Sequence, residues 1–173
     1  MTKAHQRITH FDRLEVTEFS QVFFKAIDIL RMQKKLGPVL FQLPPNLAID
    51  LPRLEAFLAS IPNDIPCAFE FRNKSWLVDP VYEALERKGV ALCLAESEKL
   101  VVPQRVTAGF VYFRLRKEEY SAAELAEITE RVNGLMADGR DVYVFFKHEE
   151  SPAGALYAEQ LLKACAVQYH TKK

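Results

Sequence analysis

The chain has 173 residues, 49% of them hydrophobic, and carries 23 basic and 23 acidic side chains. This length can bury one hydrophobic core and predicts a single domain over residues 1–173. The balanced charge excludes a whole-molecule field that would attract nucleic acid or an anionic membrane, so neither is an expected partner. The apolar runs are far shorter than the roughly 18 residues of a membrane helix, and the N-terminus lacks a signal-peptide core, so we expect a cytoplasmic protein.

The first elements of the chain follow from its hydrophobic spacing. The first dozen residues show no periodicity and residues 1–15 are expected to be irregular, with a stub of extended chain at Ile8–Phe11 as an open alternative. Helical spacing from Thr17 predicts a helix that stops at Gly37, and the apolar run 38–44 predicts a strand. Asp50 is expected to cap the next helix, whose first turn contains a proline. A helix therefore precedes and follows the first predicted strand.

The run 67–72 predicts the strand around which the chain is organised. Successive strand side chains point to opposite faces, so Phe69 and Phe71 share an apolar face. Glu70 and Arg72 then share the other face, near the C-terminal end of the strand. Open α/β sheets and barrels bind their ligands at this end, so the charged pair is the first candidate for a site.

The remaining elements repeat the alternation of strand and helix. The sequence predicts, in chain order, a helix from Asp79 to Gly89, strands over 90–95 and 110–116, a helix from Ser121 to Gly139, a strand over 142–147 and a helix from Ser151. Residues 166–173 are expected to form a frayed tail. Five strands that alternate with helices predict an α/β fold with a parallel sheet.

Polar side chains gather at one end of the predicted strands. They are Gln42, Glu70, Arg72, Glu96, Arg114 and Lys147. The carboxyl ends of parallel strands meet around one mouth, so these groups are expected to surround one small ligand. The alternative, that strand ends are simply where solvent begins, stays open. An inward Glu70 needs partners, and we expect Gln42 on one side and Glu96 or Arg114 on the other.

Glu70 is the candidate general acid or base, because a carboxylate between a basic partner and apolar walls suits proton transfer. A structural ion pair with Arg72 is an equal alternative. Arg72 and Arg114 form a candidate fork for a carboxylate or phosphate, since guanidinium groups bind both bidentately. Neutralisation of Glu70 or Glu96 is the alternative role for each arginine.

Lys147 is a candidate cation or Schiff-base amine, with a solvated lysine as the alternative. Trp76 is expected either to cover the mouth and stack on a ligand or to pack its own loop. Glu70, Glu96, His148 and Glu149 are candidate ligands for a catalytic divalent metal. This interpretation has weaker support, because His148 and Glu149 are adjacent and strand parity turns His148 away from the mouth. No metal ligand is therefore assigned.

The three cysteines, Cys67, Cys93 and Cys165, lie far apart and form no C-x-x-C motif. They predict neither a disulfide framework nor a zinc ribbon, and we expect reduced packing residues. The sequence also lacks the glycine-rich motifs of dinucleotide and nucleotide sites and the nucleophile elbow of serine hydrolases. No cofactor is expected.

A combination of segments along the chain resembles one known family. The segments are Gly37–Pro45, Glu70–Arg72 with Ser75–Trp76, Val90–Cys93, Phe110–Leu115 and Phe145–Glu149, in this order. Together they resemble the YecE-like family, uncharacterised prokaryotic proteins with a TIM-barrel fold. The resemblance covers nearly the whole chain and implies the fold without implying a function.

The resemblance also implies that about the first three strands of the family precede this chain. A complete (β/α)₈ barrel needs at least about 200 residues, so we expect a partial TIM-type barrel of five strands. Its edges at 39–43 and 142–146 would be uncovered. Uncovered edges pair with other chains, so a homo-oligomer is expected.

The expected function is binding of a small anionic molecule at the mouth by acid/base and Arg/Lys groups, and whether the molecule is also turned over stays open. Three alternatives stay open. The domain is a non-catalytic binding or scaffold module, or a truncated form without the full family activity, or a divalent-metal-dependent hydrolase.

Overall fold

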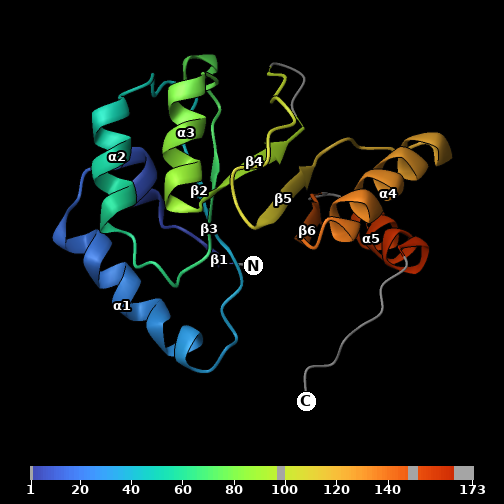
Figure 1. Ribbon diagram of the computed structural model, residues 1–173, viewed down its shortest axis with the longest axis horizontal. Helices are drawn as coiled ribbons and strands as arrows, with labels where there is room; N and C mark the ends of the chain where they lie inside the picture. Colours follow the sequence, from blue (N-terminus) through green and yellow to red (C-terminus); the bar gives the residue numbers. More distant parts are fainter. Residues whose placement is uncertain (1, 97–99, 148–151, 166–173) are drawn as a thin grey trace.

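The structure is a computed structural model that describes residues 2–96, 100–147 and 152–165. In these ranges six parallel strands lie side by side in chain order and curl into a half-barrel (Figure 1). The strands are β1 (Thr2–Lys3), β2 (Val39–Gln42), β3 (Cys67–Glu70), β4 (Ala91–Ala95), β5 (Phe110–Leu115) and β6 (Asp141–Phe146). The sheet therefore keeps the simplest order that βα units can give.

Helices follow most of the strands and cover one face of the sheet. They are the π-helix η1 (Arg7–Phe11), α1 (Glu18–Met32), α2 (Leu51–Ser60), the 3-10 helix η2 (Lys74–Trp76), α3 (Asp79–Lys88), α4 (Ala122–Ala137) and α5 (Ala153–Ala164). Figure 1 shows α1 to α3 beside the first strands and α4 with α5 beside the last. We call the helix-covered face of the sheet its outer face and the opposite face its inner face. No helix in the described ranges is both long and apolar enough to cross a membrane.

Several helix ends lie where the sequence predicts them. Asp50 caps α2, with its carboxylate accepting from the Arg53 amide at 3.1 Å. Ser121 forms a reciprocal capping box with Glu124, and α3 ends at Gly89 with a left-handed φ of 69°. The predicted stop of α1 at Gly37 is wrong. The helix ends at Met32, because the chain turns at Lys34, whose φ is 54°.

The expectations of five strands and of an irregular segment 1–15 are also wrong. Thr2 pairs with Val39 and Lys3 with Leu40, and the Ala4 amide donates to the Leu40 carbonyl at 2.9 Å. A two-residue strand has no alternation to detect, since only its backbone pairing with β2 defines it. The edge of β2 is consequently covered by β1. The other predicted edge, β6, pairs within the described residues with β5 alone.

β3 ends two residues earlier than predicted. The strand stops at Glu70, and Phe71 turns into the outer core, where its ring stacks on Trp76 with centroids 5.0 Å apart. Asn73 then caps the short helix η2 by accepting from the Ser75 amide. Strand alternation therefore no longer governs Arg72, whose side chain is exposed.

The two faces of the sheet bury different side chains. The outer face and its helices share an aromatic core that includes Phe24, Phe41, Phe57 and Phe69, and the rings of Phe41 and Phe69 stack at 5.1 Å. The inner face carries smaller groups, namely Leu40, Ala68, Ala91 and Cys93, together with Tyr112. All three cysteines are buried and reduced, as the sequence predicts. Both faces are therefore apolar along most of the sheet, and the buried polar side chains of the strands lie near the strand ends.

Candidate functional site

The centre of the candidate site is the carboxylate of Glu70, which is 2% exposed on the inner face. One of its oxygens, Oε1, accepts from Nε2 of Gln42 at 2.7 Å, and Oε2 accepts from Nη1 of Arg114. The Arg116 guanidinium lies 3.8 Å from Oε1. The predicted partners Gln42 and Arg114 are therefore confirmed.

Sheet register explains how these side chains meet. Gln42 lies directly opposite Glu70 in the β2–β3 ladder. Arg114 comes from β5, one strand further away than β4, and lies opposite Ala95. Because alanine has no bulk beyond Cβ, the arginine can extend across β4 to the carboxylate. The pair is nearly free of solvent, with Arg114 4% exposed, so each charge depends on the other.

Lys3 extends this network at the open edge of the half-barrel. Its Nζ donates to Oε1 of Gln42 at 2.8 Å, while the amide nitrogen of Gln42 donates to Glu70. Partial burial lowers the pKa of Lys3, and the nearby charge of Arg114 lowers it further, whereas Glu70 opposes the shift. Lys3 was not among the predicted site residues, because β1 gives no signal in the sequence.

Two further cations, Arg72 and Lys147, lie near this network. The charges of Arg72 and Lys147 both act on Lys3 and lower its pKa. His10, on η1, responds similarly, since burial lowers its pKa first and the charges of Lys3 and Arg72 add to the effect. Lys147 is half-buried, and its amide donates to the Leu115 carbonyl at 2.8 Å. We call this cluster at the strand ends the mouth: Lys3, Gln42, Glu70, Arg72, Arg114, Arg116 and Lys147.

The predicted pairing of Glu70 with Arg72 is wrong. Arg72 lies beyond the end of β3 and is exposed. In the described part of the chain no ion pair joins it to Glu70, whose charge is met by Arg114 instead. Arg72 contributes its positive charge at the rim of the mouth.

Trp76 was expected to cover the mouth or to pack its loop, and it does the second. The indole is 1% exposed, and its Nε1 donates to the Leu47 carbonyl at 2.8 Å. With its face stacked on Phe71, the ring belongs to the outer core. It presents no surface to a ligand in this structure.

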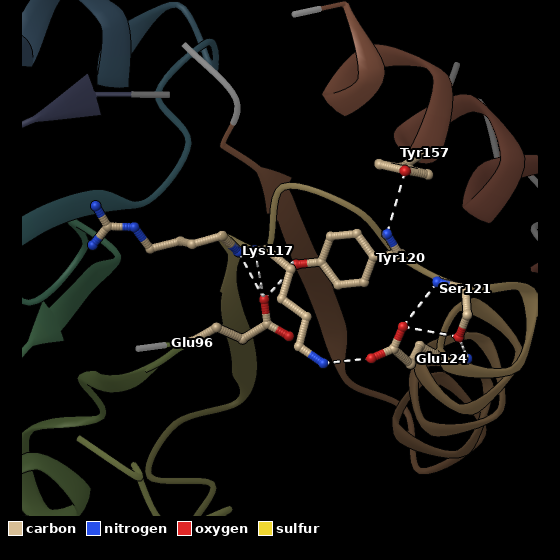
Figure 2. A network of polar contacts seen from close by, with 7 residues as sticks. Glu96, Lys117, Tyr120, Ser121, Glu124 and Tyr157 are labelled. Atoms are coloured by element: carbon tan, nitrogen blue, oxygen red, sulfur yellow. Dashed lines mark hydrogen bonds and ion pairs between the residues drawn. The ribbon is translucent and has the colours of Figure 1, made fainter. Parts of the chain in front are cut away.

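Glu96 was expected at the mouth but supports a neighbouring loop. Its Oε2 accepts from the Arg116 amide at 2.7 Å and from the hydroxyl of Tyr120 (Figure 2). The Tyr120 amide in turn donates to the hydroxyl of Tyr157 on α5 at 3.3 Å. Glu96 therefore ties the end of β4 to the β5–α4 loop, and it fixes the backbone from which the Arg116 side chain extends.

One polar group of the inner face has no assigned partner. The Tyr112 hydroxyl is buried and makes no hydrogen bond within the described residues. Burial raises the pKa of this phenol, and burial likewise raises the pKa of the neighbouring Cys93 thiol well above its usual range. Both groups stay protonated near neutral pH, so neither adds charge beneath the mouth.

The described residues contain no group of three His, Cys, Asp or Glu side chains that could hold a metal ion. Glu70 and Glu96, named in the sequence analysis among candidate ligands, engage separate partners. The other two candidates, His148 and Glu149, lie outside the described residues. The geometry of the mouth thus supplies mainly cations.

The whole chain and its fold match a family of proteins. Residues 1–173 match the family model described as "Protein of unknown function DUF72". The UPF0759 protein YunF of Bacillus subtilis (strain 168) is 25% identical over 208 residues, which cover 98% of this chain and 73% of that protein.

Solved structures agree with this match. A DUF72 family protein from Thermotoga maritima MSB8 has a TM-score of 0.81 and 27% identity to this chain, covering 93% of it and 71% of that chain. A DUF72 family protein from Enterococcus faecalis V583 has a TM-score of 0.74 at 18% identity, with coverages of 93% and 75%. The second likeness concerns the fold alone.

Proposed function

This chain belongs to the DUF72 family of proteins of unknown function, and we propose that it binds a small anionic molecule at the mouth. One observation carries the proposal. Among the described residues, the cations Lys3, Arg72, Arg114 and Arg116 gather around one buried carboxylate, in a chain whose net charge is zero. Such a local excess of positive charge attracts a small anion.

The cations of the mouth have different roles in this proposal. Arg114 is buried and neutralises Glu70, so it shapes the floor of the mouth. Arg116 keeps 31% of its side chain exposed, and Lys3 and Arg72 are exposed as well. These three are the groups within reach of a ligand, and guanidinium groups suit the oxygens of phosphate or carboxylate.

Glu70 fits a positioning role better than proton transfer in this arrangement. Each of its oxygens already accepts a hydrogen bond, one from Gln42 and one from Arg114. This observation favours a second candidate function, a binding or scaffold module without turnover. Catalysis by Glu70 or Lys147 stays a prediction, and no described cluster favours the metal-dependent alternative.

Titration with inorganic phosphate, followed by calorimetry at low salt, tests anion binding. We expect saturable binding that weakens by at least about tenfold in Arg116→Met, since a charge-assisted contact is worth roughly 1.5–3 kcal/mol. Lys25→Met removes an exposed lysine of α1, a helix on the outer face of the sheet, and is the matched control, with unchanged affinity expected. Equal affinity in both variants would place the anion elsewhere and remove the proposal.

We also propose that the half-barrel is part of a TIM-type barrel whose remaining strands complete the mouth in longer relatives. The match to only 71% of the Thermotoga maritima structure supports this idea. It predicts tighter phosphate binding by that relative than by this chain. The earlier resemblance to the YecE-like family is close to the DUF72 assignment, while the number of preceding strands stays a prediction.

A homo-oligomer through β6 also stays a proposal. Within the described part of the chain, one edge of this strand has no strand partner, and free edges invite pairing. Light scattering across a range of concentrations tests it. A monomer at the highest concentration would argue that β6 is covered in another way.

A further inference from the structure

Lys3 differs from the ion-paired lysines of the described chain in the group that accepts its hydrogen bond. It differs from Lys88, which also donates to an amide oxygen (Asn63, 2.7 Å), in the cations that surround it. Lys117 pairs with the carboxylate of Glu124, and Lys163 pairs with that of Glu159 at 2.6 Å. The Nζ of Lys3 instead donates to the neutral amide oxygen of Gln42 at 2.8 Å. A carboxylate partner stabilises the charged ammonium, and an amide does so less. Lys3 is thus held in place without an acid of its own.

The surroundings of Lys3 reinforce this difference. The charged groups that act on it are Arg114, Arg72 and Lys147, which disfavour a second cation, and Glu70, which favours one. The single carboxylate already serves Arg114. The charge of Lys3 in turn lowers the pKa of His10 on η1, so the two side chains lie close enough to interact.

We propose that Lys3 is a reactive amine that forms an imine with the carbonyl carbon of a small molecule that also carries an anionic group. The inference rests on the proposed function, because the anionic group would bind the arginines of the mouth. A free amine beside an anion site is the arrangement that such a bifunctional ligand requires.

The reaction balances without any oxidant or reductant. The neutral amine of Lys3 attacks the carbonyl carbon, forming a C–N bond as the C=O π pair moves to oxygen. Both hydrogens of the neutral amine leave with this oxygen as water, and a C=N bond remains. Gln42 directs the nitrogen through its amide oxygen, so it acts as a positioning residue.

The direction in which the pKa of Lys3 is shifted also favours Lys3 as the reactive amine. Partial burial lowers the pKa of Lys3 first, and the neighbouring cations add to it, whereas the ion pair with Glu124 raises the pKa of Lys117. More of Lys3 is therefore the neutral amine at a given pH. The chain accordingly contains an internal contrast between a mouth lysine and an ion-paired surface lysine.

The test uses pyridoxal 5′-phosphate, an anionic aldehyde, and pyridoxal, its analogue without phosphate, each trapped with borohydride at neutral pH. Mass spectrometry of peptides gives the ratio of labelling at Lys3 to labelling at Lys25, which corrects for the different reactivity of the aldehydes. We expect this ratio to be at least about tenfold higher with the phosphate, since charged hydrogen bonds have that order of effect. Inorganic phosphate should remove the excess, and Lys3→Arg should abolish it.

Two variants and one binding measurement separate the outcomes. Gln42→Leu should lower labelling at Lys3, while Lys88→Met, which removes a lysine of α3 bonded to Asn63, should leave labelling at Lys3 selective for the phosphate. If calorimetry shows phosphate binding but Lys3 reacts no faster than Lys25, the imine proposal is overturned and the anion site stands. If phosphate neither binds nor protects, both proposals fail.

Discussion

The two halves of the half-barrel are packed in different ways. β2 and β3 are buried along their whole length, and their outer face meets an aromatic core shared with α1 to α3. β6 is only half-buried, and α4 contributes one fully buried side chain, Val132. An open, apolar-lined groove of about 600 Å³ also lies between α4 and α5. Apolar burial therefore stabilises the first half more than the second.

A partly buried polar network supports the second half. The Glu96 and Tyr120 network joins β4 to the loop before α4, and the Tyr120 amide reaches α5 through Tyr157 (Figure 2). The mouth itself spans both halves, because Glu70 comes from β3 and Arg114 from β5. The difference suggests that the second half loosens first and takes part of the mouth with it.

The largest expected effect tests the aromatic core. Phe69→Ala removes a fully buried ring that stacks on Phe41, and it should lower the free energy of unfolding by about 3–5 kcal/mol. Phe145→Ala removes a half-buried ring of β6 and should cost less than about 2 kcal/mol. Urea unfolding followed by circular dichroism measures both. Equal losses would contradict the contrast between the halves.

The bridge between the halves comes next in size. Arg114→Met leaves the buried Glu70 carboxylate without its cation and should destabilise the fold by about 3 kcal/mol. Adding Glu70→Gln should recover part of that loss, because the unpaired charge disappears. Arg72→Met is the matched control, and its exposed side chain predicts a change below about 0.5 kcal/mol. Additive, small effects of the first two changes would show that the pair is solvated.

A smaller effect is expected at the polar network of the second half. Glu96→Gln weakens the charge-assisted contacts to Tyr120 and to the Arg116 amide, and about 1–2 kcal/mol should be lost. Hydrogen exchange should show the loss in α4 and α5 before α2. Glu118→Gln changes an exposed glutamate in the same loop and should leave both helices unaffected.

Thiol reactivity compares the halves without any substitution. Burial raises the pKa of Cys67 to about 12 and also raises the pKa of Cys165, so both react only when the structure opens. Cys165 follows α5 in the loosely packed half and should react at least about tenfold faster than Cys67, a difference of roughly 1.4 kcal/mol in opening. Labelling with a maleimide and peptide mapping gives the order. Reaction of Cys67 first would reverse the comparison.

The smallest effect is a difference in acid sensitivity between two helix caps. The hydrogen bonds of Lys117 and Ser121 lower the pKa of Glu124 from 4.5 to about 2. A lowered folded-state pKa stabilises the cap above the unfolded pKa and loses that contribution as pH falls from about 4.5 to 2. The cap of η2 uses Asn73, a neutral amide that does not titrate, and the first turn of η2 contains no acidic residue. Amide NMR shifts at the two caps should therefore change at Glu124 of α4 and change less at Ser75 of η2.

The parts of the fold that depend on local rules could be predicted from the sequence. Asp50 and Ser121 cap helices because short polar side chains satisfy the first amides wherever a helix follows. Gln42 and Glu70 are adjacent because alternation and parallel register fix the inner face. These features need no knowledge of distant contacts.

The failures have tertiary causes. Arg72 was assigned to the inner face because the apolar run continues past Glu70, whereas stacking of Phe71 on Trp76 ends the strand there. Lys3 was missed because β1 exists only through its pairing with β2. Where a strand ends, and whether an edge strand forms, depends on contacts with neighbouring elements. The mouth is built from such strand ends and from the edge strand β1, so the sequence alone predicts it poorly.

The shortness of β1 has a consequence for ligand recognition. Lys3 is held by the pairing of a two-residue strand and by its contact with Gln42. Short strands held by few hydrogen bonds open readily, and a ligand that needs Lys3 binds only the closed form, so opening reduces its apparent affinity. Occupancy of the mouth should then slow hydrogen exchange at the Ala4 amide, which donates to Leu40. Hydrogen exchange at β1 would then report whether the mouth is occupied.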